Sequence, residues 1–200
     1  RTQGRCLRKR LMSGVHPAIV GTPEPHGTAH WLWADESATA VFAQALAQQS
    51  LLQNVYIELN GDLGAGKTTL VRHLLKALGV QGRIKSPTYA VVEPHEGHHP
   101  VHAVPLAIWH FDFYRFNDPQ EFEEAGFRDV FASTGLKIAE WPKQAEGMLP
   151  TPDLQLTLLV DDQEGRHVQV QASTSTGLSI LQGLLAVLPP TVSAHANSTS

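Results

Sequence analysis

The chain has 200 residues, of which 42% are hydrophobic and 17% are charged. This composition suffices for one hydrophobic core and is too apolar for a disordered chain, while no run approaches the roughly 20 apolar residues of a membrane-spanning helix. The single cysteine, Cys6, excludes an internal disulfide and a cysteine-based zinc site. Because the sequence shows no secretory signal, the unpaired cysteine favours a reducing compartment, and we expect a cytoplasmic protein without a membrane partner.

The charge is unevenly distributed along the chain. The net charge is −4, but five of the 15 basic residues lie within residues 1–10, which leaves 10 basic and 19 acidic residues in the remainder. Contacts to phosphate groups need a basic surface, so this acidic body argues against broad nucleic-acid binding by the chain alone.

The composition predicts one domain between two less ordered ends. Residues 1–30 are rich in arginine, proline and glycine and are expected to form a disordered leader. A transit peptide is the alternative for this segment, although no amphipathic helix follows the arginines. Residues 31–188 are expected to form the folded domain, and residues 189–200 a disordered polar tail.

Hydrophobic periodicity and turn signals predict an alternation of helices and strands. In chain order they are a helix over 38–49 opened by Asp35, a strand over 54–59, a helix over 68–78, strands over 88–93 and 106–112, a short acidic helix over 119–125, a strand over 135–140, a hairpin of 154–160 and 167–172, and a helix over 178–188.

A histidine-rich segment, residues 94–105, separates two of the predicted strands and contains His95, His98, His99 and His102. Four histidines this close together could bind a metal ion, but no carboxylate or cysteine constellation accompanies them. We therefore interpret the segment as a variable hairpin loop that should tolerate changes in length.

The strongest motif is Gly61-Asp-Leu-Gly-Ala-Gly-Lys-Thr-Thr69, which matches G-x-x-x-x-G-K-[ST] between a predicted strand and a predicted helix. In such a loop the glycines let successive backbone N–H groups point at phosphate oxygens, and the helix N-terminus adds partial positive charge. Lys67 would reach the β- and γ-phosphates, and the Thr68 hydroxyl would bind Mg²⁺. The predicted nucleotide-binding residues are Gly61, Asp62, Leu63, Gly64, Ala65, Gly66, Lys67, Thr68 and Thr69.

Two acidic residues end apolar runs that are predicted to be strands: Asp112 follows residues 106–111, and Glu140 follows residues 135–139. A P-loop needs an acid that holds Mg²⁺ or orders its water, and ligands of α/β sheets lie at the carboxyl ends of the strands. Both acids are therefore candidates for the phosphate end of the site, and a surface position is the alternative for each.

The reaction class is narrowed by what the sequence lacks. A guanine-specifying N-K-x-D motif is absent, which disfavours a GTPase. A small-molecule kinase remains open on the P-loop alone, although such enzymes gather several arginines around the transferred phosphate and the arginines beyond residue 30 are scattered. A nucleotide-gated binding module with negligible turnover is a third possibility.

Several stretches together resemble the TsaE (YjeE) family of bacterial P-loop ATPases. They are the P-loop at 61–69, Lys85-Ser-Pro-Thr-Tyr89, Val92-Glu-Pro94, His110-Phe-Asp-Phe-Tyr-Arg115 and Glu140-Trp-Pro142, and the resemblance spans roughly residues 32–185. It implies an α/β fold, namely a single P-loop NTPase-like domain with a central mixed parallel and antiparallel sheet flanked by helices. The leader and the length of the histidine-rich segment depart from the family pattern.

The resemblance also implies roles for particular residues. Thr68 and Glu140 would be the Mg²⁺ ligands, and Asp112 would be a second catalytic acid that orders water in the ATP site. A switch-like loop beside the γ-phosphate would comprise Ser86, Pro87, Thr88 and Tyr89, with Trp141 as a further partner contact; the alternative for Tyr89 and Trp141 is that they are core aromatics. Weaker correspondences place Asp35, Glu36 and Arg166 at the nucleotide.

Proteins of this family do not transfer the threonylcarbamoyl group themselves. They join a TsaB–TsaD pair in which TsaD modifies the tRNA, and slow, partner-dependent ATP hydrolysis resets the pair. The resemblance therefore implies ATP and Mg²⁺ as cofactors, TsaB and TsaD as partners, and contact with tRNA only indirectly through the complex.

Overall fold

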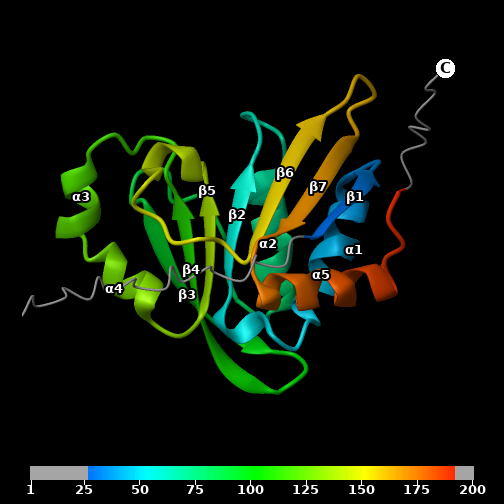
Figure 1. Ribbon diagram of the computed structural model, residues 1–200, viewed down its shortest axis with the longest axis horizontal. Coiled ribbons are helices and arrows are strands. Elements are labelled where there is room, and N and C mark those ends of the chain that lie inside the picture. Colours follow the sequence, from blue (N-terminus) through cyan, green and yellow to red (C-terminus); the bar gives the residue numbers. More distant parts are fainter. Residues whose placement is uncertain (1–26, 192–200) are drawn as a thin grey trace, which may run out of the picture.

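A seven-stranded sheet organises the computed structural model, which describes residues 27–191 (Figure 1). The strands lie in the order β1, β7, β6, β2, β5, β4, β3. Their bounds are β1 Gly27–Trp33, β2 Tyr56–Asn60, β3 Val92–His99, β4 Val104–Asp112, β5 Leu136–Glu140, β6 Leu154–Val160 and β7 Arg166–Ala172. The four central strands run parallel, while β1, β7 and β3 pair antiparallel with their neighbours. The expected α/β fold with a mixed sheet is confirmed.

Helices pack on the sheet and enclose two separate apolar cores. The larger core lies between the sheet and the helices α1 (Glu36–Ala47), α2 (Lys67–Ala77) and α5 (Ser175–Val187). The smaller core is a cluster of phenylalanines under α3 (Pro119–Glu124), α4 (Phe127–Ala132) and the 3₁₀ turn Pro142–Ala145. Figure 1 shows α3 and α4 beside β4 and β5, and α1 and α5 toward the β1 end. Within residues 27–191, no helix is both long enough and apolar enough to cross a membrane.

The helix starts follow the capping signals of the sequence. The carboxylate of Asp35 accepts the N–H of Ala38 at 3.1 Å and caps α1, and the hydroxyl of Thr174 accepts the N–H of Gly177 at 3.0 Å and caps α5. The helices predicted over 38–49, 68–78 and 178–188 are all present near their expected bounds. A further short 3₁₀ turn, Leu52–Asn54, leads into β2.

The boundary of the predicted leader is wrong by four residues, because β1 begins at Gly27 and residues 27–30 belong to the sheet. Along β1, buried and exposed positions alternate, and Trp31 and Trp33 pack against Phe42 with ring centres 5.4 and 5.0 Å apart. The tail also begins later than expected, since the N–H of Thr191 donates to the carbonyl of His30 at 2.9 Å. The predictions for residues 1–26 and 192–200 fall outside the described residues.

The histidine-rich segment forms a hairpin as expected, but most of it is strand and not loop, because β3 continues to His99 and β4 already starts at Val104. The His99 side chain is fully buried, and its Nε2 lies 3.0 Å from the carbonyl oxygen of Gln49. The N–H of His98 donates to the carbonyl of Leu78 at 2.7 Å, which ties the hairpin to the end of α2. Within the described part of the chain, no three His, Cys, Asp or Glu side chains form a group that could hold a metal ion.

The strand predicted over 88–93 begins later than expected, at Val92. Val91 adopts a left-handed conformation with φ of 63° and donates its N–H to the carbonyl of Pro87 at 2.7 Å. Residues 87–91 therefore form a turn, and this turn carries the predicted switch residues toward the P-loop instead of along the sheet.

The buried histidine makes the hairpin testable. We expect His99→Ala to lower the free energy of unfolding by about 2 kcal/mol or more, because it opens a cavity in place of a fully buried ring and removes the partner of the Gln49 carbonyl. His98→Ala, at an exposed neighbouring position of β3, is the matched control and should change the free energy by less than about 0.5 kcal/mol. Urea unfolding of both variants measures the difference, and equal midpoints would show that the hairpin is a dispensable loop after all.

Candidate nucleotide site

The loop between β2 and α2 has the shape that its glycines allow. Gly61, Gly64 and Gly66 have φ angles of 140°, 83° and 103°, which side-chain-bearing residues rarely adopt. A β-carbon on Gly61 would lie 2.4 Å from the carbonyl oxygen of Leu158 in β6, so the close approach of loop and strand requires glycine. The N–H groups at the start of α2 are thereby directed at the mouth of the loop.

Lys67 is the first residue of α2, and its ammonium group folds back over the loop. Its Nζ donates to the carbonyls of Gly61 at 2.6 Å and Asp62 at 2.8 Å, and lies 3.9 Å from the centre of a Trp141 ring. The residue is only 4% exposed. Burial lowers the pKa of Lys67, while the carboxylates of Glu140 and Asp112 act in the opposite direction. These contacts hold a cation where the motif needs one.

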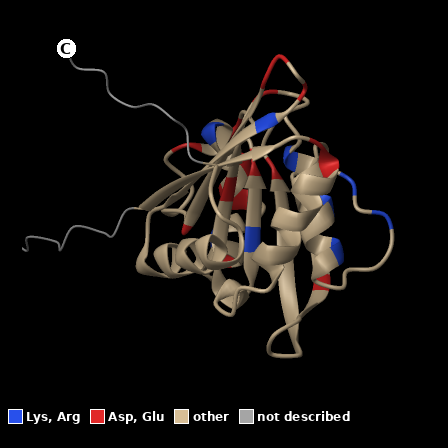
Figure 2. Ribbon diagram, turned by 90° about the vertical axis from the view of Figure 1, so that its right-hand side faces the viewer, with Lys and Arg blue, Asp and Glu red and all other residues tan. Residues whose placement is uncertain are grey.

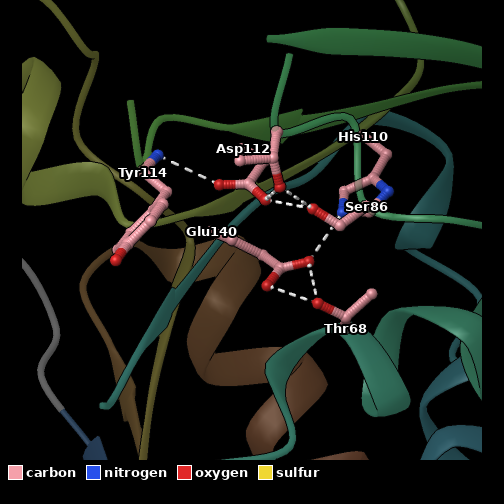
Figure 3. A network of polar contacts seen from close by, with 7 residues as sticks. Thr68, Ser86, His110, Asp112, Tyr114 and Glu140 are labelled. Atoms are coloured by element: carbon pink, nitrogen blue, oxygen red, sulfur yellow. Dashed lines mark hydrogen bonds and ion pairs between the residues drawn. The ribbon is translucent and has the colours of Figure 1, made fainter. Parts of the chain in front are cut away.

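The second residue of α2 contacts the acid that ends β5. The Thr68 hydroxyl lies 2.9 and 3.0 Å from the two carboxylate oxygens of Glu140 (Figure 3). The other side of this carboxylate is held by His110 of β4, whose Nε2 lies 2.9 Å from Oε1. Glu140 is 2% exposed and His110 is fully buried. A hydroxyl and a carboxylate are oxygen donors of the kind that Mg²⁺ prefers, so this pair fits a magnesium ion.

The acid that ends β4 is tied to the predicted switch residues Ser86–Tyr89, which lead into the turn at 87–91 and which we call the turn at 86–89. The hydroxyls of Ser86 and Thr88 donate to Oδ2 of Asp112, that of Ser86 in a short contact and that of Thr88 at 2.9 Å. The two hydroxyls are also 2.6 Å apart. The remaining oxygen of Asp112 accepts the N–H of Tyr114 at 3.0 Å (Figure 3). Because β4 and β5 are parallel and in register, Asp112 lies directly beside Glu140 in the sheet.

These side chains surround one cavity of about 280 Å³. The cavity is lined by many of the site residues that the sequence predicted, namely Leu63, Gly64, Gly66, Lys67, Thr68, Thr69, Ser86, Thr88, Asp112, Glu140 and Trp141. Tyr114 also lines it, and His110 supports it from below through Glu140. The sequence analysis gave these two residues no role, although the alternation of β4 was a usable signal, because it places His110 on the same face as Asp112.

Other predicted residues lie at the edge of the site or away from it. Gly61 and Asp62 line a neighbouring hollow that shares Trp141 with the cavity, and Ala65 is buried within the loop. The Nε of Arg166 lies 3.8 Å from where a β-carbon of Gly66 would be, so Arg166 is beside the P-loop.

Two of the predicted switch residues, Pro87 and Tyr89, do not line the cavity. Pro87 is buried, whereas Tyr89 is 85% exposed and is not a core aromatic. The guanidinium carbon of Arg115 lies 4.5 Å from the ring centre of Tyr89. This stacked pair presents an aromatic ring to solvent beside the turn at 86–89.

The two acidic residues that open the first helix do not line the cavity. Asp35 caps α1, and its carboxylate also accepts the Ser37 hydroxyl at 2.5 Å. Glu36 lies 2.8 Å from Nε2 of His73 and so links α1 to α2. The hydrogen bonds from Ser37 and Ala38 lower the pKa of Asp35.

A glycine loop between a strand and a helix, facing acids at the ends of neighbouring parallel strands, defines a P-loop nucleotide-binding protein. The chain belongs to the TsaE family, because the family model described as threonylcarbamoyl adenosine biosynthesis protein TsaE matches residues 33–168. The resemblance given by the sequence motifs is thereby confirmed, and every predicted site residue lies inside the matched range.

Individual relatives agree with the family. The tRNA threonylcarbamoyladenosine biosynthesis protein TsaE of Haemophilus influenzae is 38% identical over 140 residues, which cover 70% of this chain and 84% of the relative. The protein of the same name from Rickettsia bellii is 36% identical over 129 residues, covering 64% of this chain and 84% of the relative. The crystal structure of Bacillus subtilis YdiB superposes with a TM-score of 0.66 at 22% identity, covering 82% of this chain and 97% of that one, and supports the fold.

The cap at Asp35 gives a prediction with a defined pH dependence. A capping carboxylate with a lowered pKa stabilises the fold above its unfolded pKa, and this contribution is lost as the pH falls through the folded pKa. We therefore expect Asp35→Ala to melt at a lower temperature than the wild type at pH 7, and the difference to shrink only as the pH falls below about 4, through the lowered pKa of the folded state. Asp35→Ser keeps a cap and should melt like the wild type. If Asp35→Ser instead weakened ATP binding, the residue would have a nucleotide role that the geometry does not indicate.

Proposed function

We propose that the chain binds ATP together with Mg²⁺ and hydrolyses it slowly, and that this cycle supports tRNA threonylcarbamoyladenosine modification by resetting a TsaB–TsaD pair. The observation that carries the ATPase part is the contact between the Thr68 hydroxyl and the buried carboxylate of Glu140 inside the P-loop cavity. The pathway part is supported by the relatives, which are biosynthesis proteins of this modification.

Phosphate binding would use groups that are already in position. The N–H groups of the P-loop and of the first turn of α2 are donors for phosphate oxygens. Lys67 is held between the Gly61 and Asp62 carbonyls and the Trp141 ring, and phosphate oxygens would replace the carbonyls as its partners. Burial lowers the pKa of Lys67, and the carboxylates of Glu140 and Asp112 counteract this effect.

The oxygen atoms of Thr68 and Glu140 would hold the magnesium ion, and His110 fixes the orientation of Glu140. When bound, Mg²⁺ neutralises charge on the β- and γ-phosphates. Asp112 is the remaining acid and is available to orient the attacking water and to accept its proton. Its present hydrogen bonds to Ser86 and Thr88 connect this task to the turn at 86–89.

Slow intrinsic hydrolysis is supported by the scarcity of basic residues among the described residues that line the cavity. Of the described residues that line it, Lys67 is the single basic one, and none is an arginine. Phosphoryl-transfer sites without an arginine near the transferred group turn over slowly until a partner or a rearrangement supplies the missing charge. The same observation gives no support to a small-molecule kinase.

Different consequences are expected from removing the charge of each acid. Glu140→Gln should weaken the magnesium dependence of ATP binding, because it replaces a metal-binding carboxylate with an amide. Asp112→Asn should retain ATP binding but lower turnover by roughly 100-fold or more. Calorimetry with and without Mg²⁺ and phosphate-release assays measure the two effects, with the exposed Glu146→Gln as a control. If both site variants behave like this control, the assignment of the acids is wrong.

The turn at 86–89 should couple the nucleotide to the partner. We expect the affinity for the TsaB–TsaD pair to be about 5- to 150-fold higher with a non-hydrolysable ATP analogue than with ADP. Thr88→Ala removes a hydroxyl that holds Asp112 and should bring this ratio close to one, whereas Thr151→Ala, at an exposed position far along the chain, should not. A wild-type affinity that is equal in all nucleotide states would refute the reset mechanism.

A further inference from the structure

Four basic side chains gather around a second hollow, on the flank of α2. Arg72 and Lys76 are one helical turn apart on α2, while Arg83 and Lys85 come from the segment between α2 and the turn at 86–89. We call these four residues the cationic flank. The hollow has a volume of about 580 Å³. Figure 2 shows the blue segments along α2 and the loop beside it.

The cationic flank is unusual in a chain that is acidic elsewhere. Residues 27–191 contain 10 basic and 18 acidic residues, and four of the 10 basic ones line this hollow. In the part of the chain that the structure describes, no ion pair involves any of the four. By contrast, the exposed Arg128 pairs with Glu123 at 2.5 Å. The flank therefore carries uncompensated positive charge, which attracts an anionic partner.

The hollow is adjacent to the nucleotide cavity, and the two share Thr68 and Ser86 as wall residues. Thr68 contacts the metal-binding acid, and Ser86 contacts Asp112. A molecule that fills the hollow would therefore contact Thr68 and Ser86. These two residues also line the nucleotide cavity, where we expect the γ-phosphate and Mg²⁺ to bind. Occupancy of the two sites would be thermodynamically coupled, in both directions by the same factor.

We infer that the cationic flank binds an acidic segment of the protein partner. This inference rests on the proposed function, because the partner is taken to be the TsaB–TsaD pair. The negative charge of an acidic segment is confined to a few side chains, which matches four cations around one hollow. RNA is disfavoured as the occupant, because its backbone extends negative charge beyond the flank onto an acidic body. Nor does an aromatic side chain line the hollow among the described residues, as stacking on bases would need.

The test compares one charge reversal on the flank with a matched reversal elsewhere. Arg83→Glu and Arg128→Glu change the net charge equally and both lie at exposed positions, but only Arg83 lines the hollow. Affinity for the purified TsaB–TsaD pair is measured in the presence of an ATP analogue at several salt concentrations. We expect Arg83→Glu to weaken binding about tenfold near physiological salt, and to make binding less sensitive to salt. Arg128→Glu should change the affinity less than twofold.

Further measurements separate the ways in which the inference could fail. Calorimetry with ATP and thermal melting should give wild-type values for both variants, which would show that the fold and the nucleotide site are intact. If the wild type does not bind the pair at all, the proposed function is wrong. A double variant, Lys76→Glu combined with Arg83→Glu, removes a second cation of the flank. If the wild type binds the pair, and the single and double variants bind it with the same affinity as the wild type, the flank is not the contact. If these variants lose binding of isolated tRNA but retain the pair, the occupant is RNA and the inference is overturned.

Discussion

Strand β5 lies between β2 and β4 and is parallel to both. This pairing brings the carboxyl ends of the three strands to one edge of the sheet, where β2 continues into the P-loop and β4 and β5 end in Asp112 and Glu140. The start of α2 then places Thr68 against Glu140. Groups that are far apart in the sequence converge because the carboxyl ends of parallel neighbouring strands lie at the same end of the sheet. The two cores, one on each face, keep this register fixed.

The convergence places several charged groups in a poorly solvated space. Lys67, Asp112 and Glu140 are each at most 4% exposed, and His110 below them is fully buried. Buried charges of this kind seldom stabilise a fold relative to apolar residues of similar size. They persist where their arrangement serves binding or chemistry, since a low-dielectric site strengthens their attraction for phosphates and metal ions. The cluster is therefore better explained by ligand binding than by stability.

The sequence predicted much of this arrangement because the relevant signals are local. The spacing of glycines, lysine and threonine in 61–69 specifies a loop, and an apolar run that ends in an acid specifies a strand end, so the cavity could be anticipated. The extension of the hairpin strands through the histidine-rich segment could not, because its histidines have the composition of a loop, and the contact of His99 is with the distant carbonyl of Gln49. Residues 27–30 were missed for the same reason, since β1 becomes a strand through β7. The cap at Asp35 was recognised, but a cap and a nucleotide contact use the same acidic residue type.

The position of β1 has a consequence for how the chain folds. β1 pairs with β7, and the indole N–H of Trp31 donates to the carbonyl of Leu188, 157 positions later, at 3.2 Å. β1 therefore has no strand partner until nearly the whole described domain has been synthesised. Contacts of such long sequence separation slow folding, because loop-closure entropy is lost before the contact forms. During this interval the backbone N–H and C=O groups of β1 are unpaired, a state that favours aggregation of a nascent chain.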